Sequence, residues 1–194
     1  MEIESKFISS GCNTVYNAAT WHKTLPLIAY ASSNHVNIYD VNNNKVHLTL
    51  NGHTKRVNHS QFLTLSKEIT LLSSDSDGQL FIWKNGNDPF NHKDWRREAK
   101  AKTDECISQF SVYEISETAV YIVTVSTSTQ VTLWFYDGKE VQKLDSLLFG
   151  TTFQETSVLQ LIEDRYLMLF LGGIDRMVHV YSVDLKEESK KLEY

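Results

Sequence analysis

Cysteine and proline are both scarce in this chain of 194 residues. The two cysteines, Cys12 and Cys106, lie far apart without metal-type spacing, so the sequence indicates neither a disulfide framework nor a cysteine-based metal site. Reduced thiols are the rule in the cytosol and the nucleus, so we expect a cytoplasmic and nuclear protein. The two prolines, Pro26 and Pro89, interrupt none of the strands predicted below.

Long apolar runs and an excess of positive charge are also lacking. The longest apolar run, YLMLFLGG from Tyr166, is too short to span a bilayer, so we expect no membrane contact. The N-terminal stretch MEIESKFISSG is too acidic and too poor in apolar residues for a signal peptide. A net charge of −5 excludes the chain as a whole as an electrostatic surface for nucleic acid, although it leaves local basic patches open.

Helical periodicity is the third feature that is hard to find. Short runs rich in Val, Ile, Thr, Tyr, Phe and Trp are separated by turns of Gly, Asn, Asp and Ser, which is typical of β-strands. The predicted strands are Thr14–Thr20, Leu27–Ala31, His35–Asp40, Lys45–Leu50, Val57–Leu63, Ile69–Ser74, Gln79–Lys84, Cys106–Val112, Ala119–Val125, Gln130–Phe135, Glu140–Leu147, Ser157–Ile162, Tyr166–Leu171 and Met177–Val183. The chain is therefore predicted to be all-β.

Four of these segments share one pattern. They are HVNIYD, QLFIWK, QVTLWF and MVHVYS, and their aromatic residues Tyr39, Trp83, Trp134 and Tyr181 are 44, 51 and 47 positions apart. Four-stranded units that repeat every 40–50 residues or so are typical of a β-propeller. A single sheet cannot cover both of its faces, whereas stacked sheets cover each other. We predict blades near residues 11–50, 51–100, 104–147 and 150–194.

One short span combines the residues of a Ser-His-Asp set. His53 stands in LNGHTKRVN, and Ser73, Ser74 and Asp77 stand in SSDSDGQLFIWK, shortly before Trp83. A catalytic set needs an exposed hydroxyl, an oxyanion hole and room for a substrate, and nothing near Ser73 indicates these. A buried polar group without a partner costs about 1–3 kcal/mol, so buried groups of these types are expected to bond one another. We therefore favour a structural hydrogen-bond network over catalysis.

The Gly52-His53 pair, followed by SSDSDGQLFIW, resembles a WD repeat. The resemblance implies that Asp77, six positions before the tryptophan, bonds His53, that His53 bonds Ser73 or Ser74, and that this serine reaches the indole N–H of Trp83. Lys84 stands where the namesake dipeptide of the WD-repeat family has Asp, which is a common departure.

The other repeats depart further from the pattern. Asp175 keeps the acid six positions before Tyr181, but Ser128 and Ser33 replace it in the third and first repeats. We expect these blades to be held mainly by packing.

The order of segments resembles one group within the family, the scaffold subunits of a tRNA-modifying complex. The resemblance rests on GCNTVYNAATW at Gly11–Trp21, on VNIYD followed by LTLNGHTKRVN, and on the stretch from Leu147–Gly150 to Leu171–Val183. It implies a non-catalytic scaffold that binds other protein subunits and supports wobble-uridine modification in tRNA. It implies no cofactor and no small-molecule substrate for this chain.

The same resemblance implies that the chain supplies four blades of a seven-bladed ring and is a fragment of a longer protein. The segment Ser5–Ser9 is then a candidate for the strand that closes the ring. Four blades leave two flanks with apolar faces and unpaired strand edges, which more chain or another molecule should cover. We expect the isolated chain to associate with itself or to dissolve poorly.

Metal and cofactor chemistry find no support in the remaining motifs. The histidines are His22, His35, His47, His53, His59, His92 and His179. Three of them are spaced six apart, but they fall on different strands and a turn without a nearby Cys or carboxylate at ligand spacing. We predict no metal site and no catalytic residues, and no phosphate loop or nucleophile elbow is visible.

Two basic stretches are candidates for contact with partners. The stretch HKDWRREAKAK contains Trp95, Arg96, Arg97 and Lys100 and can be interpreted as an RNA-binding stripe with an aromatic base platform, or as a charged outer strand. A weak tRNA contact through this stripe is our alternative function. Lys55 and Arg56 follow His53 in a predicted turn, where propellers often bind partner proteins through loops.

Overall fold

The computed structural model describes residues 11–65, 68–86, 88–163, 165–187 and 190–193, and within this part of the chain the regular secondary structure consists of strands and one short 3₁₀ turn. The strands are β1 (Ala19–Trp21), β2 (Leu27–Ser32), β3 (His35–Asp40), β4 (Lys45–Asn51), β5 (Val57–Leu63), β6 (Ile69–Asp75), β7 (Gln79–Asn85), β8 (Trp95–Lys102), β9 (Ile107–Glu114), β10 (Val120–Ser126), β11 (Gln130–Tyr136), β12 (Val141–Leu148), β13 (Phe153–Ile162), β14 (Tyr166–Gly173) and β15 (Val178–Asp184). A single 3₁₀ turn, His92–Asp94, precedes β8 in the described chain.

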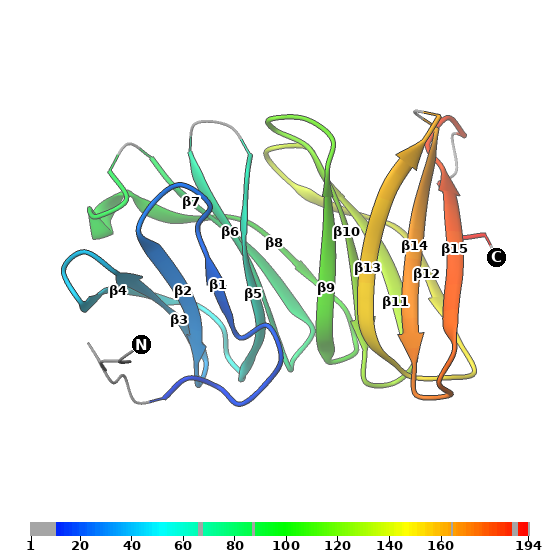
Figure 1. Ribbon diagram of the computed structural model, residues 1–194, viewed down its shortest axis with the longest axis horizontal. Coiled ribbons are helices and arrows are strands. Elements are labelled where there is room, and N and C mark those ends of the chain that lie inside the picture. Colours follow the sequence, from blue (N-terminus) through cyan, green and yellow to red (C-terminus); the bar gives the residue numbers. More distant parts are fainter. Residues whose placement is uncertain (1–10, 66–67, 87, 164, 188–189, 194) are drawn as a thin grey trace, which may run out of the picture.

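The strands form four antiparallel meanders that follow one another along the chain. Their orders are β1-β2-β3-β4, β5-β6-β7-β8, β9-β10-β11-β12 and β13-β14-β15. The sheets stand side by side from the blue to the red end of the ribbon, and the first strands of neighbouring sheets, β1, β5, β9 and β13, are adjacent (Figure 1). The all-β prediction and the predicted class, a partial WD-repeat propeller, are confirmed. We refer to the sheets as blades 1 to 4.

The hydrophobic core consists of three clusters, each between two successive blades. Between blades 1 and 2, Leu27, Ala29 and Ile38 pack against Leu71 and Trp83. The clusters between blades 2 and 3 and between blades 3 and 4 are built in the same way. Every residue of β6 and of β10 is buried, because the second strand of a blade is covered on both faces. Burial between sheets therefore explains why these strands are apolar throughout.

A β-bulge recurs at one position in three blades. The pairing between the third and fourth strands shifts by one residue between Ile38 and Tyr39, between Ile82 and Trp83, and between Leu133 and Trp134. The extra residue on the outer strand is His47 in blade 1, Glu98 in blade 2 and Leu144 in blade 3. The repeat recognised in the sequence is thus also a repeat of backbone geometry.

Strand β1 begins later than the sequence predicted. The prediction placed a strand over Thr14–Thr20, whereas β1 spans Ala19–Trp21. The amide of Ala18 donates to the carbonyl of Val15, and Asn17 has a positive φ of 59°, so the chain turns just before the strand. Asparagine adopts this left-handed conformation more readily than most residues, which a count of β-formers does not register.

Blade 4 has three strands and an open flank in the described chain. Beyond β15, Glu193 exchanges two backbone hydrogen bonds with Ser182, which form an isolated antiparallel bridge at the edge of blade 4. Val178 and Val180 on β15 and Met177 beside it are exposed, by 67%, 38% and 64%. The predicted closing strand Ser5–Ser9 lies outside the described residues. None of the described segments is a helix long and apolar enough to cross a membrane.

Candidate interaction site

A chain of hydrogen bonds lies between the β4–β5 loop and the interior of blade 2. The indole nitrogen Nε1 of Trp83 lies 2.8 Å from Oγ of Ser73, which lies 2.8 Å from Nε2 of His53. The other ring nitrogen, Nδ1 of His53, lies 2.9 Å from Oδ2 of Asp75. The ring of His53 is also stacked on Phe81, with 4.2 Å between the ring centroids. A loop residue is thereby held against two strands.

The direction of each bond follows from the inventory of donors. An indole N–H can only donate, so Ser73 accepts from Trp83 and has its own O–H free to donate to Nε2 of His53. The remaining ring proton sits on Nδ1 and is donated to the carboxylate of Asp75. Each polar side-chain group of the network then has a partner within the protein.

The sequence prediction for the acid of this network was wrong. Asp77 was assigned to it by counting back from Trp83, but Asp77 lies in the exposed β6–β7 turn, where its Oδ2 accepts from Lys102 at 3.1 Å and from Gln79 at 3.3 Å. Asp75, the last residue of β6, points inward instead. Its second oxygen, Oδ1, accepts the backbone amides of Asp77 and Gln79 at 2.9 Å each. The carboxylate of Asp75 thus accepts hydrogen bonds both from His53 of the network and from the backbone of the β6–β7 turn.

The serine assignment is resolved in favour of Ser73. Successive residues of a strand point to opposite faces, so Ser74 faces away from His53. Among the described residues, its buried hydroxyl oxygen makes no hydrogen bond.

The Ser73-His53-Asp75 connectivity is that of a hydrolytic triad, but the chemistry is blocked. The hydroxyl of Ser73 is completely buried and already accepts from an indole. A nucleophile must meet a substrate carbonyl, and no path from solvent to this oxygen exists in the described chain. These residues therefore form a structural hydrogen-bond network that attaches the β4–β5 loop to β6 and β7.

Blade 3 keeps half of this arrangement. The indole of Trp134 donates to Oγ1 of Thr124 at 2.9 Å, at the position that corresponds to Trp83 and Ser73. Ser126 replaces Asp75 and accepts the backbone amide of Gln130 at 2.8 Å. In blade 4, Asp175 bonds the backbone amide of Met177 and the ring of His179 in an exposed turn. Blade 3 thus has a hydroxyl cap at the position of Asp75, whereas blade 4 has Gly173 there and caps its turn with Asp175.

The stretch 92–102 does not form a continuous basic stripe. Trp95 is only 9% exposed, and its indole N–H donates to the carbonyl of Pro89 at 3.1 Å, so no base can stack on it. The guanidinium of Arg97 lies over the ring of Phe81 at 4.7 Å. The stretch is an outer strand, β8, and the interpretation of Trp95 as a base platform is wrong.

Arg96 and Lys100 lie on opposite faces of this strand. Arg96 pairs with Lys84 across the sheet, and its Nε lies 2.8 Å from the carboxylate of Glu98. Lys100 pairs with Phe81, which faces blade 1. Alternation along the strand, shifted by the bulge, thus separates charges that are close in sequence.

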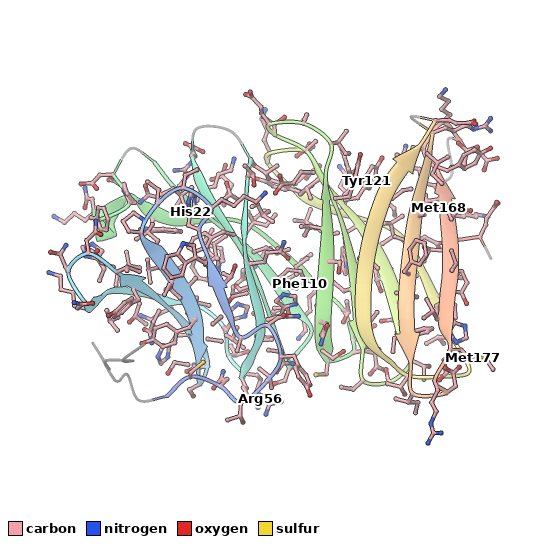
Figure 2. All side chains as sticks on the ribbon, in the orientation of Figure 1. His22, Arg56, Phe110, Tyr121, Met168 and Met177 are labelled. Carbon is pink, nitrogen blue, oxygen red and sulfur yellow. The ribbon has the colours of Figure 1, made fainter. Side chains whose placement is uncertain are left out.

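Lys55 and Arg56 occupy the exposed loop between β4 and β5, as predicted. Arg56 lies at the lower rim of the molecule in Figure 2, and its Nε donates to Oδ1 of Asn58 at 3.2 Å. Arg56 lines a recess of about 650 Å³, whereas Lys55 does not.

The recess lies where the innermost strands of all four blades begin. Its lining residues are Thr14, Val15, Tyr16, Arg56, Asn58, Cys106, Ser108, Gln109, Thr127, Thr152 and Phe153. Two asparagines each join one blade to the first strand of the next blade beside the recess. Asn13 donates to the carbonyl of Val57 at 2.9 Å, and Asn58 donates to that of Ile107 at 2.7 Å. Of these residues only Arg56 was a predicted contact residue, because the others come together only through the propeller geometry.

His59 lies deeper between blades 2 and 3. Its ring is stacked on Phe110 with 3.8 Å between centroids, and its Nδ1 accepts the backbone amide of Phe110 at 3.1 Å. Burial lowers the pKa of His59 to about 3, because the charged imidazolium would lose its hydration. His59 is therefore neutral at physiological pH.

The evenly spaced histidines do not meet. Nδ1 and Nε2 of His53 are both used in the network, His59 stacks on Phe110, and His47 contacts the carbonyl of Phe90. In the part of the chain that the structure describes, no group of three His, Cys, Asp or Glu residues is placed to hold a metal ion.

Comparison with known proteins agrees with this architecture. No family model matches the chain. It is similar to Elongator complex protein 2 of Dictyostelium discoideum (25% identity over 97% of the chain), of Arabidopsis thaliana (27% over 94%) and of Mus musculus (29% over 87%). The chain spans 23%, 24% and 21% of the lengths of these relatives.

Two solved structures show the fold. Sqt1 of Saccharomyces cerevisiae superimposes with a TM-score of 0.71 at 16% identity, and the match covers 96% of this chain and 48% of Sqt1. The designed protein Ika8 gives a TM-score of 0.58 at 13% identity, covering 83% of this chain and 44% of that protein.

Proposed function

We propose that this chain is a non-catalytic WD-repeat scaffold that holds protein subunits together in an Elongator-type complex. The observation that carries the proposal is the similarity to Elongator complex protein 2, which extends over 80–97% of the chain and over blades with WD geometry. Cytoplasm and nucleus are the proposed locations, and modification of wobble uridine in tRNA is the proposed process.

The distribution of polar groups supports a scaffold. The Ser73-His53-Asp75 set is used inside blade 2, where it fixes a loop. The exposed charges lie in loops and on outer strands, where a partner protein can reach them. Function in this fold therefore resides at the rims of the blades.

Affinity purification of the tagged chain from cells that express it tests the proposal. We expect a stoichiometric set of large protein partners whose recovery survives ribonuclease. Recovery of tRNA alone, lost after ribonuclease treatment, would instead support the RNA-binding alternative. Deletion of the gene should lower the carboxymethylated wobble uridine measured by mass spectrometry of tRNA nucleosides.

Two variants provide a matched control for this purification. Asp75→Ala breaks the buried network and should reduce partner recovery, whereas Asp77→Ala changes an exposed turn and should leave recovery intact. Partner recovery that is equal for both variants and the parent would mean that blade 2 does not contribute to assembly.

A further inference from the structure

The recess at the start of the innermost strands contains an unused polar group. Gln109 on β9 is only 6% exposed and lines the recess. Its side-chain amide makes no hydrogen bond to any residue that the structure describes. Among the described residues only the hydroxyl of Ser74 is both fully buried and unpaired, so the amide of Gln109 still reaches the space of the recess, where water or a ligand can satisfy it.

Arg56 brings a single positive charge to the same recess. The other lining residues are neutral hydroxyl, amide, thiol, aliphatic and aromatic side chains. A guanidinium has five N–H donors, and of these only Nε is used by a described side chain, that of Asn58. The remaining donors are suited to a carboxylate, which arginine binds in a bidentate manner.

The rim of the recess offers apolar surface beside this charge. Tyr16 is 80% exposed and Val15 is half-buried, and both line the recess. The volume of about 650 Å³ falls within the range of ordinary ligand sites, which is roughly 300–1,000 Å³. The recess thus fits a short segment that combines an acidic side chain with apolar neighbours.

We propose that this recess binds an acidic peptide segment of a partner protein. The carboxylate of the peptide pairs with Arg56, its backbone amide meets the side chain of Gln109, and an apolar neighbour rests on Tyr16. The proposal rests on the scaffold function above and assigns a binding site to it.

A peptide fits this end of the molecule better than a nucleic acid. Asp104 and Glu105 lie in the β8–β9 loop, next to Cys106 of the recess, and this loop bonds the β6–β7 turn through Thr103 and Gly78. These carboxylates and the net charge of −5 oppose a polyanion, whereas one carboxylate needs only one guanidinium.

Selection from a phage-displayed library of random peptides of about a dozen residues on the immobilised full chain tests the proposal. Enriched sequences should contain Asp or Glu beside an apolar residue. Synthetic versions should bind at least about tenfold more weakly to Arg56→Glu and to Gln109→Leu, because each variant removes a charge-assisted or amide contact. Lys55→Glu is the matched control, because it changes the neighbouring charge outside the recess and should retain most of the binding.

Cys106 provides an independent readout on the unmodified chain. Its thiol lines the recess, whereas Cys12 is exposed in an adjacent recess that shares Thr14 and Arg56 with it. A bound peptide should slow alkylation of Cys106 by iodoacetamide more than that of Cys12, as measured by mass spectrometry.

The outcomes separate this proposal from the scaffold function. If no peptide is enriched, if enriched peptides lack acids, or if Arg56→Glu binds them unchanged, the recess is not this site, even where purification recovers protein partners. If labelled oligouridine binds the recess and peptides do not, the peptide proposal is overturned in favour of RNA. Acidic peptides selected by a chain that recovers no partners would support the recess and refute the scaffold.

Discussion

Nδ1 of His53 lies 2.9 Å from Oδ2 of Asp75, and both side chains are entirely inaccessible to solvent. This contact joins a residue of the β4–β5 loop to the last residue of β6, across twenty-two positions of sequence. Because Asp75 also accepts two backbone amides of the next turn, one side chain positions both loops at this end of blade 2.

Asp75→Ala should therefore lower the free energy of unfolding by about 3 kcal/mol, since it leaves a buried imidazole N–H and two amides without an acceptor. Asp77→Ala should shift the unfolding midpoint much less, because the hydrogen bonds from Lys102 and Gln79 to Asp77 lie at the surface, where water replaces them at little cost. Urea unfolding followed by tryptophan fluorescence measures both variants. A larger loss for Asp77→Ala would contradict the network as described.

Ser73→Ala and Ser74→Ala form a second matched pair. Oγ of Ser73 is the central atom of the network. Its removal leaves the indole of Trp83 and the ring of His53 unsatisfied and should lower the free energy of unfolding by about 1–3 kcal/mol. Ser74→Ala removes a buried hydroxyl that has no partner among the described residues and should be neutral or slightly stabilising. The same urea titration checks both, and equal losses would refute the assignment.

Acidification should destabilise the fold through His59. Its pKa is about 3 when folded and about 6.5 when unfolded, so the unfolded chain binds the proton first. The stability that depends on neutral His59 is fully present above pH 6.5 and is lost as the pH falls from there toward 3. Between pH 7 and pH 5 the loss should be about 2 kcal/mol.

His59→Gln isolates this effect, because an amide oxygen can still accept from Phe110 and does not titrate in this range. The difference in stability between the parent and this variant, measured across that pH interval, should shrink on acidification. A difference independent of pH would rule out the buried neutral histidine.

Lys84 is more than a harmless replacement in the repeat signature. Its Nζ donates to the carbonyl of Gly138 in blade 3 at 3.1 Å, lies 3.7 Å from Glu68, and sits over the ring of Tyr136. Lys84→Asp, which restores the family dipeptide, would place a third carboxylate near Glu68 and Glu98 and should cost about 2 kcal/mol. Lys84→Met keeps the aliphatic length and should cost less. Thermal unfolding ranks the two, and a stabilised Lys84→Asp would contradict the inter-blade role.

The sequence predicted the fold well because burial between blades leaves a strong periodic signal. Strands such as His35–Asp40 and Val57–Leu63 agree with their predicted bounds to the residue. β1 was predicted too early because the positive φ of Asn17 is set by a turn, and the pattern of β-formers does not report φ.

The site was harder to predict, since it depends on which face a side chain occupies. Counting positions from Trp83 selected Asp77, although alternation along β6 places Asp75 on the same face as Ser73. The stretch around Trp95 left two interpretations open, an RNA-binding stripe and a charged outer strand, because its charged neighbours do not indicate that Trp95 points inward. Gln109 carries no local signal at all, because its surroundings come from other blades.

The bulge on the outer strands has a consequence for insertions and deletions. His47, Glu98 and Leu144 are extra residues relative to the partner strand, and the side chains on either side of each keep their proper faces only because that residue is present. Deleting one of them would reverse the two faces of the outer strand on one side of the deletion. Apolar side chains there would then face solvent, and charged side chains would face the adjoining sheet. Length variation in this fold should therefore be tolerated in the loops and excluded at these three positions.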